Sequence, residues 1–128
     1  MVLSVNLKRE FIPKWNGNDK ASASEQIKIV HRPATVSMKE RLFPREFSYG
    51  LNGEVKGVFT VDRKKIIKEF TIELVNIAYQ VEGEKDVRKI KTVDELFDAP
   101  PEFDSLIDEI YGYYQDLLNN KVNEKNSE

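Results

Sequence analysis

Alternating apolar and polar residues near the start of the chain predict an N-terminal β-hairpin. Residues 3–8 alternate strictly, which is typical of a half-buried strand, and Phe11 extends the pattern. Residues 26–31 alternate in the same way and predict the second strand. Small polar residues fill 16–25 and predict a hairpin loop longer than a tight turn. The inward positions of the two strands are Leu3, Val5, Leu7, Ile27 and Ile29.

The middle of the chain predicts short elements. Ser37 and Glu40 match a capping box, so we expect a short helix through Leu42-Phe43, stopped by Pro44. Residues 46–57 contain three glycines and predict a loop or a small flexible hairpin.

A second group of elements follows Asp62, which can cap a helix. Apolar residues at helical spacing predict an amphipathic helix over 63–74. Alternating β-branched and aromatic residues favour a strand over 75–81. Residues 87–91 are its expected hairpin partner, with the charged run 82–86 as the turn.

The C-terminal part contains the strongest helix signal. Thr92 and Glu95 form a second capping box that opens a one-turn helix to Phe97, and Pro100-Pro101 start the long helix. The polar residues 119–128 predict a flexible tail. The chain is therefore expected to form a single α+β domain over residues 1–118. The apolar stripe of the long helix is Phe103, Leu106, Ile107, Ile110, Tyr113 or Tyr114, Leu117 and Leu118.

Composition narrows the possible functions. The chain has 128 residues, of which 40% are hydrophobic, enough to bury the core of one domain. It has no cysteine and a single histidine, His31, which excludes disulfides and thiol nucleophiles and makes a hydrolytic triad improbable. No apolar run is long enough for a membrane span, and the first residues do not match a signal peptide. We expect a cytosolic protein, in a cell or in an infected host.

Charge is distributed unevenly along the sequence. Residues 1–70 hold 14 basic and 8 acidic side chains, whereas residues 71–128 hold 6 basic and 14 acidic ones. Three interpretations are open: nucleic-acid binding by the basic half, head-to-tail association of copies, or neutralisation of the two halves within one fold. Head-to-tail association would produce oligomers that dissociate at high salt.

No pattern in the sequence indicates catalysis. Asp104 and Asp108 lie on one helix face, but no third ligand completes a metal site, and a solvated face explains them equally well. The glycines at 50, 53 and 57 do not match a phosphate loop. His31 has no evident partner and is interpreted as structural or exposed. We therefore expect no catalytic, cofactor-binding or metal-binding residue, and a function in association.

Partly exposed aromatic residues are the best candidates for protein contacts. Trp15 is one of them. Tyr111 and one of the pair Tyr113 and Tyr114 are expected to lie off the main apolar stripe of the long helix, where aromatic residues often mark an interface. A broad stripe that faces the core is the alternative. The candidate interaction residues are Trp15, Arg41, Arg45, Phe103, Ile107, Tyr111 and Tyr114.

Three segments together carry a family resemblance. The first is a strand running into Pro-Ala-Thr-Val-Ser-Met-Lys-Glu-Arg-Leu at 33–42, and the second is a strand, a glycine-containing turn and an Ile-x-Thr-x-x-Glu-Leu step within 76–96. The third is the terminal amphipathic helix with its polar tail. In these segments the chain resembles the small tail assembly chaperones of long-tailed bacteriophages.

The resemblance implies a specific role. Such chaperones bind the long, largely helical tape-measure protein, help to recruit tail-tube subunits, and are absent from the mature virion. Many exist in two forms, the longer made by a programmed ribosomal frameshift, and the chain would then be the short form. The alternatives are a virion structural protein, such as a head–tail connector or tail-completion protein, and a small nucleic-acid-binding protein that uses the basic N-terminal half.

Overall fold

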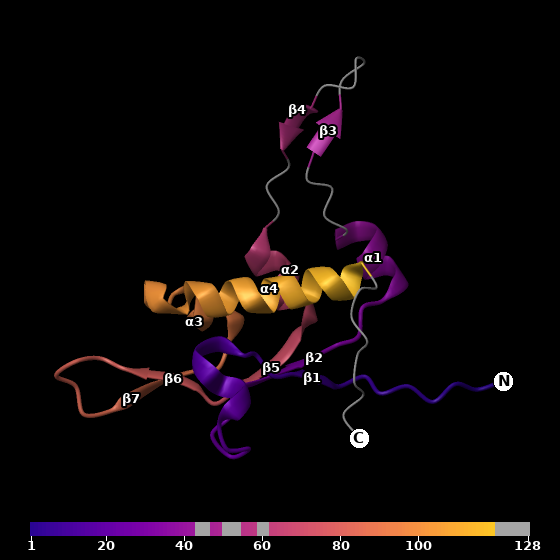
Figure 1. Ribbon diagram of the computed structural model, residues 1–128. Coiled ribbons are helices and arrows are strands. Elements are labelled where there is room, and N and C mark those ends of the chain that lie inside the picture. The colour runs from indigo at the N-terminus through magenta and orange to yellow at the C-terminus, as the bar shows by residue number, and fades with distance from the viewer. Residues whose placement is uncertain (43–46, 50–54, 59–61, 120–128) are drawn as a thin grey trace.

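A three-stranded antiparallel sheet and a long helix form the centre of the molecule (Figure 1). The computed structural model describes residues 1–42, 47–49, 55–58 and 62–119. Together with further helices and two hairpins, these elements make an α+β fold, as predicted. The central elements are β1 (Arg9–Phe11), β2 (Lys28–His31) and β5 (Thr71–Val75), in the sheet order β1-β2-β5, and α4 (Asp104–Leu118).

The predicted N-terminal hairpin is present, but its first strand is displaced. β1 pairs antiparallel with β2, with Arg9 opposite His31 and Phe11 opposite Ile29. The prediction of a strand over 3–8 is wrong, because β2 ends at His31 and Pro33 follows it, so residues 1–8 have no strand opposite them. These eight residues form an extended arm that leads away from the sheet (Figure 1).

The connection between β1 and β2 is more ordered than the predicted loop. It contains a short 3-10 segment, η1 (Trp15–Lys20), whose Asn18 is buried. The Asn18 amide donates to the carbonyl oxygens of Pro13 (2.8 Å) and Ile27 (3.0 Å), and its Oδ1 accepts from the Ile27 N–H (2.6 Å). One polar side chain therefore satisfies the backbone on both sides of the connection.

The first helix begins earlier than its sequence signal suggested. α1 (Val36–Leu42) is capped by Thr35, whose Oγ1 accepts from the Met38 N–H at 3.0 Å. The capping role predicted for Ser37 is wrong, because Ser37 already lies inside the helix. The predicted end at Phe43-Pro44 lies outside the described residues.

The glycine-containing stretch forms a small hairpin. β3 (Phe47–Tyr49) pairs antiparallel with β4 (Val55–Val58), which agrees with the hairpin alternative.

The helix that follows Asp62 is shorter than predicted. Asp62 caps α2 (Arg63–Phe70) by accepting from the Lys65 N–H at 3.2 Å, as expected. The helix ends at Phe70 and not at residue 74, because β5 follows at once and pairs with β2. Leu74 is still buried, but as a strand residue.

A second predicted hairpin is confirmed, with shifted bounds. β6 (Ile77–Gln80) pairs with β7 (Val87–Ile90). Val75 belongs to β5 and not to β6, because Asn76 has a φ of +63° and separates the two strands. Thr92 caps α3 (Val93–Phe97) as expected, since its hydroxyl accepts from the Glu95 N–H at 3.1 Å.

The core lies between the sheet and the helices α2 and α4. The 3-10 turn η2 (Pro101–Phe103) leads into α4, and the predicted apolar stripe of α4 is buried, with Tyr114 as the inward tyrosine and Tyr113 half-buried. Tyr114 stacks on Phe70 of α2, and Tyr113 stacks on Phe11 of β1, with ring centroids 4.5 and 4.0 Å apart. Within the described residues, no helix is both long and apolar enough to cross a bilayer.

Candidate interaction surface

An open groove lies beside α1 and α2, with a volume of about 610 Å³. Among its described lining residues, Met38 is apolar and only 6% exposed, and the other six are charged. Because four of the lining side chains are cationic and two are carboxylates, the described part of the groove is net basic. The lining residues are Arg32, Met38, Asp62, Lys64, Lys65, Lys68 and Glu69.

Charged residues of α2 line this groove because of their positions in the helical repeat. Ile66, Ile67 and Phe70 are buried against the core. The charged residues of the helix therefore point away from the core, as the 3.6-residue period requires. Lys65 and Lys68 are exposed, and Lys64 and Glu69 are half-buried.

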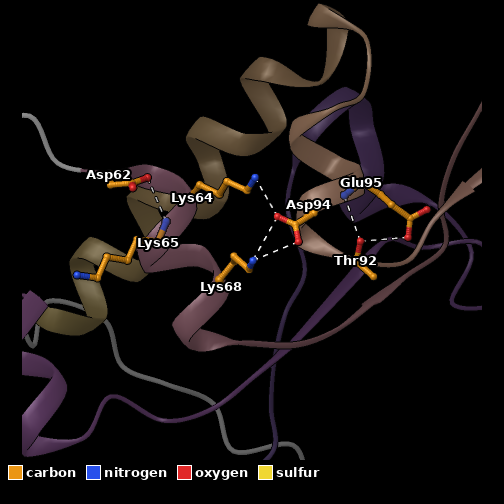
Figure 2. A network of polar contacts seen from close by, with 7 residues as sticks. All are labelled: Asp62, Lys64, Lys65, Lys68, Thr92, Asp94 and Glu95. Carbon is orange, nitrogen blue, oxygen red and sulfur yellow. Dashed lines mark hydrogen bonds and ion pairs between the residues drawn. The ribbon is translucent and has the colours of Figure 1, made fainter.

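Two of the groove lysines are engaged by one carboxylate. Asp94, in the first turn of α3, accepts from Lys64 (2.9 Å) and Lys68 (3.1 Å), as Figure 2 shows. Hydrogen bonds from Lys64 and Lys68 hold the pKa of Asp94 below its usual value, and Asp94 in turn raises the pKa of Lys64. These pairs are solvent-exposed, so they contribute little to stability. Their main effect is to lower the net positive charge at this end of the groove.

Asp104 and Asp108 of α4 form ion pairs with Arg63 of the basic helix α2. Arg63 donates to Asp104 (3.1 Å) and also to Asp108, and its guanidinium lies 6.0 Å from the Phe97 ring centroid. This arrangement makes the two carboxylates partners of an arginine. Across the part of the chain that the structure describes, no three His, Asp or Glu side chains gather as a metal-binding group.

These ion pairs bear on the three interpretations of the uneven charge distribution. The basic helix α2 packs against the acidic helices α3 and α4, so the two halves neutralise each other at Arg63, Lys64 and Lys68. Arg32 is also engaged, because it donates to the carbonyl oxygen of Glu69 at 3.0 Å. Lys65 is the exposed groove cation whose ammonium makes no ion pair within the described contacts.

Arg41, a predicted interaction residue, lies at the rim of the groove. Its guanidinium contacts both carboxylate oxygens of Glu69, at 3.0 and 3.5 Å. The hydrogen bonds from Arg41 hold the pKa of Glu69 below its usual value. The other predicted arginine, Arg45, lies outside the described residues.

The aromatic candidates divide into surface and core residues. Trp15 is half-buried, donates its indole N–H to the Ser105 hydroxyl at 2.9 Å, and stacks on Phe103 with ring centroids 5.3 Å apart. Tyr111 is also half-buried, and its hydroxyl accepts from Gln115 at 2.9 Å. These two residues retain surface that a partner could contact.

Three other candidates are core residues. Phe103, Ile107 and Tyr114 are between 0 and 6% exposed, so in this structure they support the fold and do not form a surface. An amphipathic pattern does not show how wide the covered face of a helix is, since that depends on the layers packed against it.

His31 is structural, one of the two outcomes expected for it. It is fully buried, with Nδ1 2.8 Å from the Arg32 carbonyl oxygen and Nε2 2.9 Å from the Tyr113 hydroxyl. A carbonyl only accepts, so we assign the proton to Nδ1 and the role of acceptor to Nε2. Burial lowers the pKa of His31, and burial raises the pKa of Tyr113 to about 12.

Two surface features were missed by sequence reasoning. The groove depends on Met38 and Arg32, which are far from α2 in the sequence, although the basic run at 63–68 was visible. The exposed arm was misread as a half-buried strand. In the structure Leu3, Val5 and Leu7 are 77, 58 and 67% exposed.

Comparison with known proteins identified no relative. No family model, no curated protein and no solved structure matches the chain.

Proposed function

We propose that this chain is a non-catalytic assembly chaperone of the phage-tail type, which binds a tape-measure protein in the groove between α1 and α2. The observation that carries the proposal is the groove itself, whose described lining is net basic. A largely helical client can place the acidic face of an amphipathic segment there, near the exposed Lys65.

The charge of the groove suits reversible binding. Lys65 is exposed, and Lys64 and Lys68 share the single carboxylate Asp94. An acidic client segment can therefore engage Lys65, for which the described contacts include no ion pair. Such contacts act through rapid, salt-sensitive encounter more than through high affinity. The chaperone would act in the host cytoplasm and leave before the virion is complete.

Nucleic-acid binding by the basic half is a weaker candidate. Arg63, Lys64 and Lys68 are already paired with carboxylates of α3 and α4, whereas a phosphate-binding surface depends on cations free to neutralise phosphates.

Co-expression tests the proposal. The tagged chain is produced together with the tape-measure protein encoded near its own gene, and recovery of soluble complex is measured at low and high salt. We expect the tape-measure protein to co-purify at low salt. The Lys65→Glu variant should reduce recovery several-fold, whereas the Lys20→Glu control, at an exposed position of η1, should not.

Two results would contradict the proposal. One is equal recovery of the tape-measure protein with both variants, which would remove the groove as the binding site. The other is the presence of the chain in purified virions at a fixed stoichiometry, which would favour the structural-protein alternative.

A further inference from the structure

A single carboxylate beside the groove holds two of its lysines. Asp94 Oδ1 lies 2.9 Å from the Lys64 ammonium and 3.2 Å from that of Lys68, and Asp94 Oδ2 lies 3.1 Å from Lys68 (Figure 2). Both lysines line the groove, whereas Asp94 lines a smaller neighbouring hollow of about 220 Å³. Lys68 lines both spaces, so it marks the boundary between them.

The position of Asp94 is fixed by its helix. Val93 and Leu96, on either side of it, are 8 and 0% exposed and anchor α3 in the core. The Thr92 hydroxyl accepts from the Glu95 N–H and so secures the first turn, which contains Asp94. The Asp94 carboxylate is therefore an acceptor whose place is set by the fold.

The lysines are the mobile partners of this contact. The side chains of Lys64 and Lys68 are 42 and 50% exposed, and each ammonium sits on a flexible four-carbon stem. The two residues are four positions apart, so they lie on one face of α2 and converge on one carboxylate. An ammonium has three donors, so either lysine can turn from Asp94 toward another acceptor. The contact with Asp94 also identifies the chemical group that this pair of lysines binds, which is a carboxylate.

We propose that Asp94 is an internal competitor for the acidic client segment, which takes Lys64 and Lys68 from Asp94 as it binds along the groove. This inference deepens the proposed function and rests on it. Lys65, for which the described contacts include no ion pair, receives the first client carboxylate. A second carboxylate, one turn along the client helix, then replaces Asp94 on the neighbouring lysines.

Such competition selects clients with several carboxylates on one helical face. Asp94 belongs to the same chain as the lysines, so its effective concentration beside them is high, and a lone free carboxylate does not displace it. In a helix with carboxylates at i and i+4, the Cβ atoms of the two residues are about 5–6 Å apart. Once Lys65 holds one of them, the other is local as well and competes with Asp94 on equal terms. Asp94 returns to the lysines when the client leaves, which favours release.

A synthetic helical peptide supplies a defined probe for this competition. The peptide is alanine-rich with glutamates four residues apart, and a second peptide carries glutamine at the same positions. Affinity for the full chain is measured by fluorescence anisotropy at low salt. We expect Asp94→Asn to bind the glutamate peptide about three- to tenfold more tightly than the unmodified chain does, because a competing ion-pair partner is removed. The glutamine peptide should show no such gain.

Asp116→Asn is the matched control variant. It makes the same change in net charge at an exposed position of α4, and it should leave the affinity for the glutamate peptide unchanged. A second background separates direct competition from a general effect of charge. When Lys64 and Lys68 are both replaced by glutamine, Asp94 no longer has these lysines to hold, so adding Asp94→Asn should not tighten binding.

Two outcomes would overturn the inference. One is equal affinity of Asp94→Asn and Asp116→Asn for the glutamate peptide, including no binding by either. The other is a gain from Asp94→Asn that persists when both lysines are replaced.

Failure of this inference is distinguishable from failure of the proposed function. If Lys65→Glu reduces recovery of the tape-measure protein but Asp94→Asn raises neither recovery nor peptide affinity, the groove is the binding site and the competition is wrong. If Asp94→Asn tightens peptide binding but no tape-measure protein is recovered, the competition is supported and the client is a different acidic helix.

Discussion

Residues 3–7 and residues 27–31 have the same alternating pattern and opposite environments. Ile27 and Ile29 are buried between the sheet and the helices, whereas Leu3, Val5 and Leu7 are exposed. The difference lies in what is opposite each segment. β2 is the central strand, paired on both sides by β1 and β5, while the arm extends past the end of β2, where no strand of the described part of the chain pairs with it. Alternation therefore specifies a two-faced strand but does not supply the layer that covers it.

The largest expected effect is loss of a buried residue from the central strand. Ile29→Ala should lower the free energy of unfolding by about 2–5 kcal/mol, because it removes a fully buried side chain and leaves a cavity. Denaturant titration measures the change. Ile29→Val should cost about 0.5–1.5 kcal/mol. A loss below 1 kcal/mol for Ile29→Ala would contradict its central place in the core.

The second prediction concerns pH and the buried end of β2. The pKa of His31 is lowered from its ordinary value of 6.5, mainly by burial and also by the nearby charge of Arg9. The unfolded chain therefore binds a proton more readily than the folded one. The contribution of His31 to the free energy of unfolding should be fully present above about pH 6.5. It should be lost as the pH drops through the pKa that His31 has in the folded chain.

Unfolding at about pH 7.5 and about pH 5 checks this prediction, since the lowered pKa values of Asp94 and Glu69 act only at lower pH. Removing the ionisable ring in His31→Gln should flatten the dependence. An equally steep dependence in that variant would assign the effect to another group.

The two capping boxes repeat the contrast between identical patterns in different contexts. Thr92→Ala should lower the free energy of unfolding by about 1 kcal/mol, because its hydroxyl accepts from the Glu95 N–H. Ser37→Ala should change it by less than about 0.5 kcal/mol, since Ser37 lies inside α1 and Thr35 is the cap. Thermal unfolding measures both variants. A larger loss from Ser37→Ala than from Thr92→Ala would reverse the assignment of the caps.

The smallest expected effect is in the arm. Val5→Ala should change the stability of a single copy by less than about 0.5 kcal/mol, because Val5 is already exposed. Denaturant titration measures the change. A loss comparable to that of Ile29→Ala would show that the arm packs on its own chain.

Most helices and both predicted hairpins were accessible to sequence reasoning because their signals are local. The hydroxyl of Thr92 and the carboxylate of Asp62 reach backbone groups only three residues away, and the stripe of α4 repeats every turn. Two failed predictions, the strand over 3–8 and the end of the helix after Asp62, involve distant partners. The helix after Asp62 ends at Phe70 because β2 pairs with the following residues, which come from about forty positions earlier in the chain.

Only some residues of the candidate surface could be predicted from the sequence. Trp15, Tyr111 and Arg41 were singled out and do retain exposed surface, whereas Phe103, Ile107 and Tyr114 are covered by other elements. The groove joins Arg32 and Met38 to α2, a juxtaposition that no local pattern contains.

The sequence by itself determined the class of fold, the position of the strongest helix, the caps of α2 and α3, and the uneven distribution of charge. Periodicity and capping act over a few residues, so they can be read along the chain. Only the tertiary structure decided which apolar residues are covered, that Arg63 neutralises Asp104 and Asp108, and that His31 is buried against Tyr113. Burial and ion pairing depend on distances between residues remote in sequence, and those distances are set by how the layers pack.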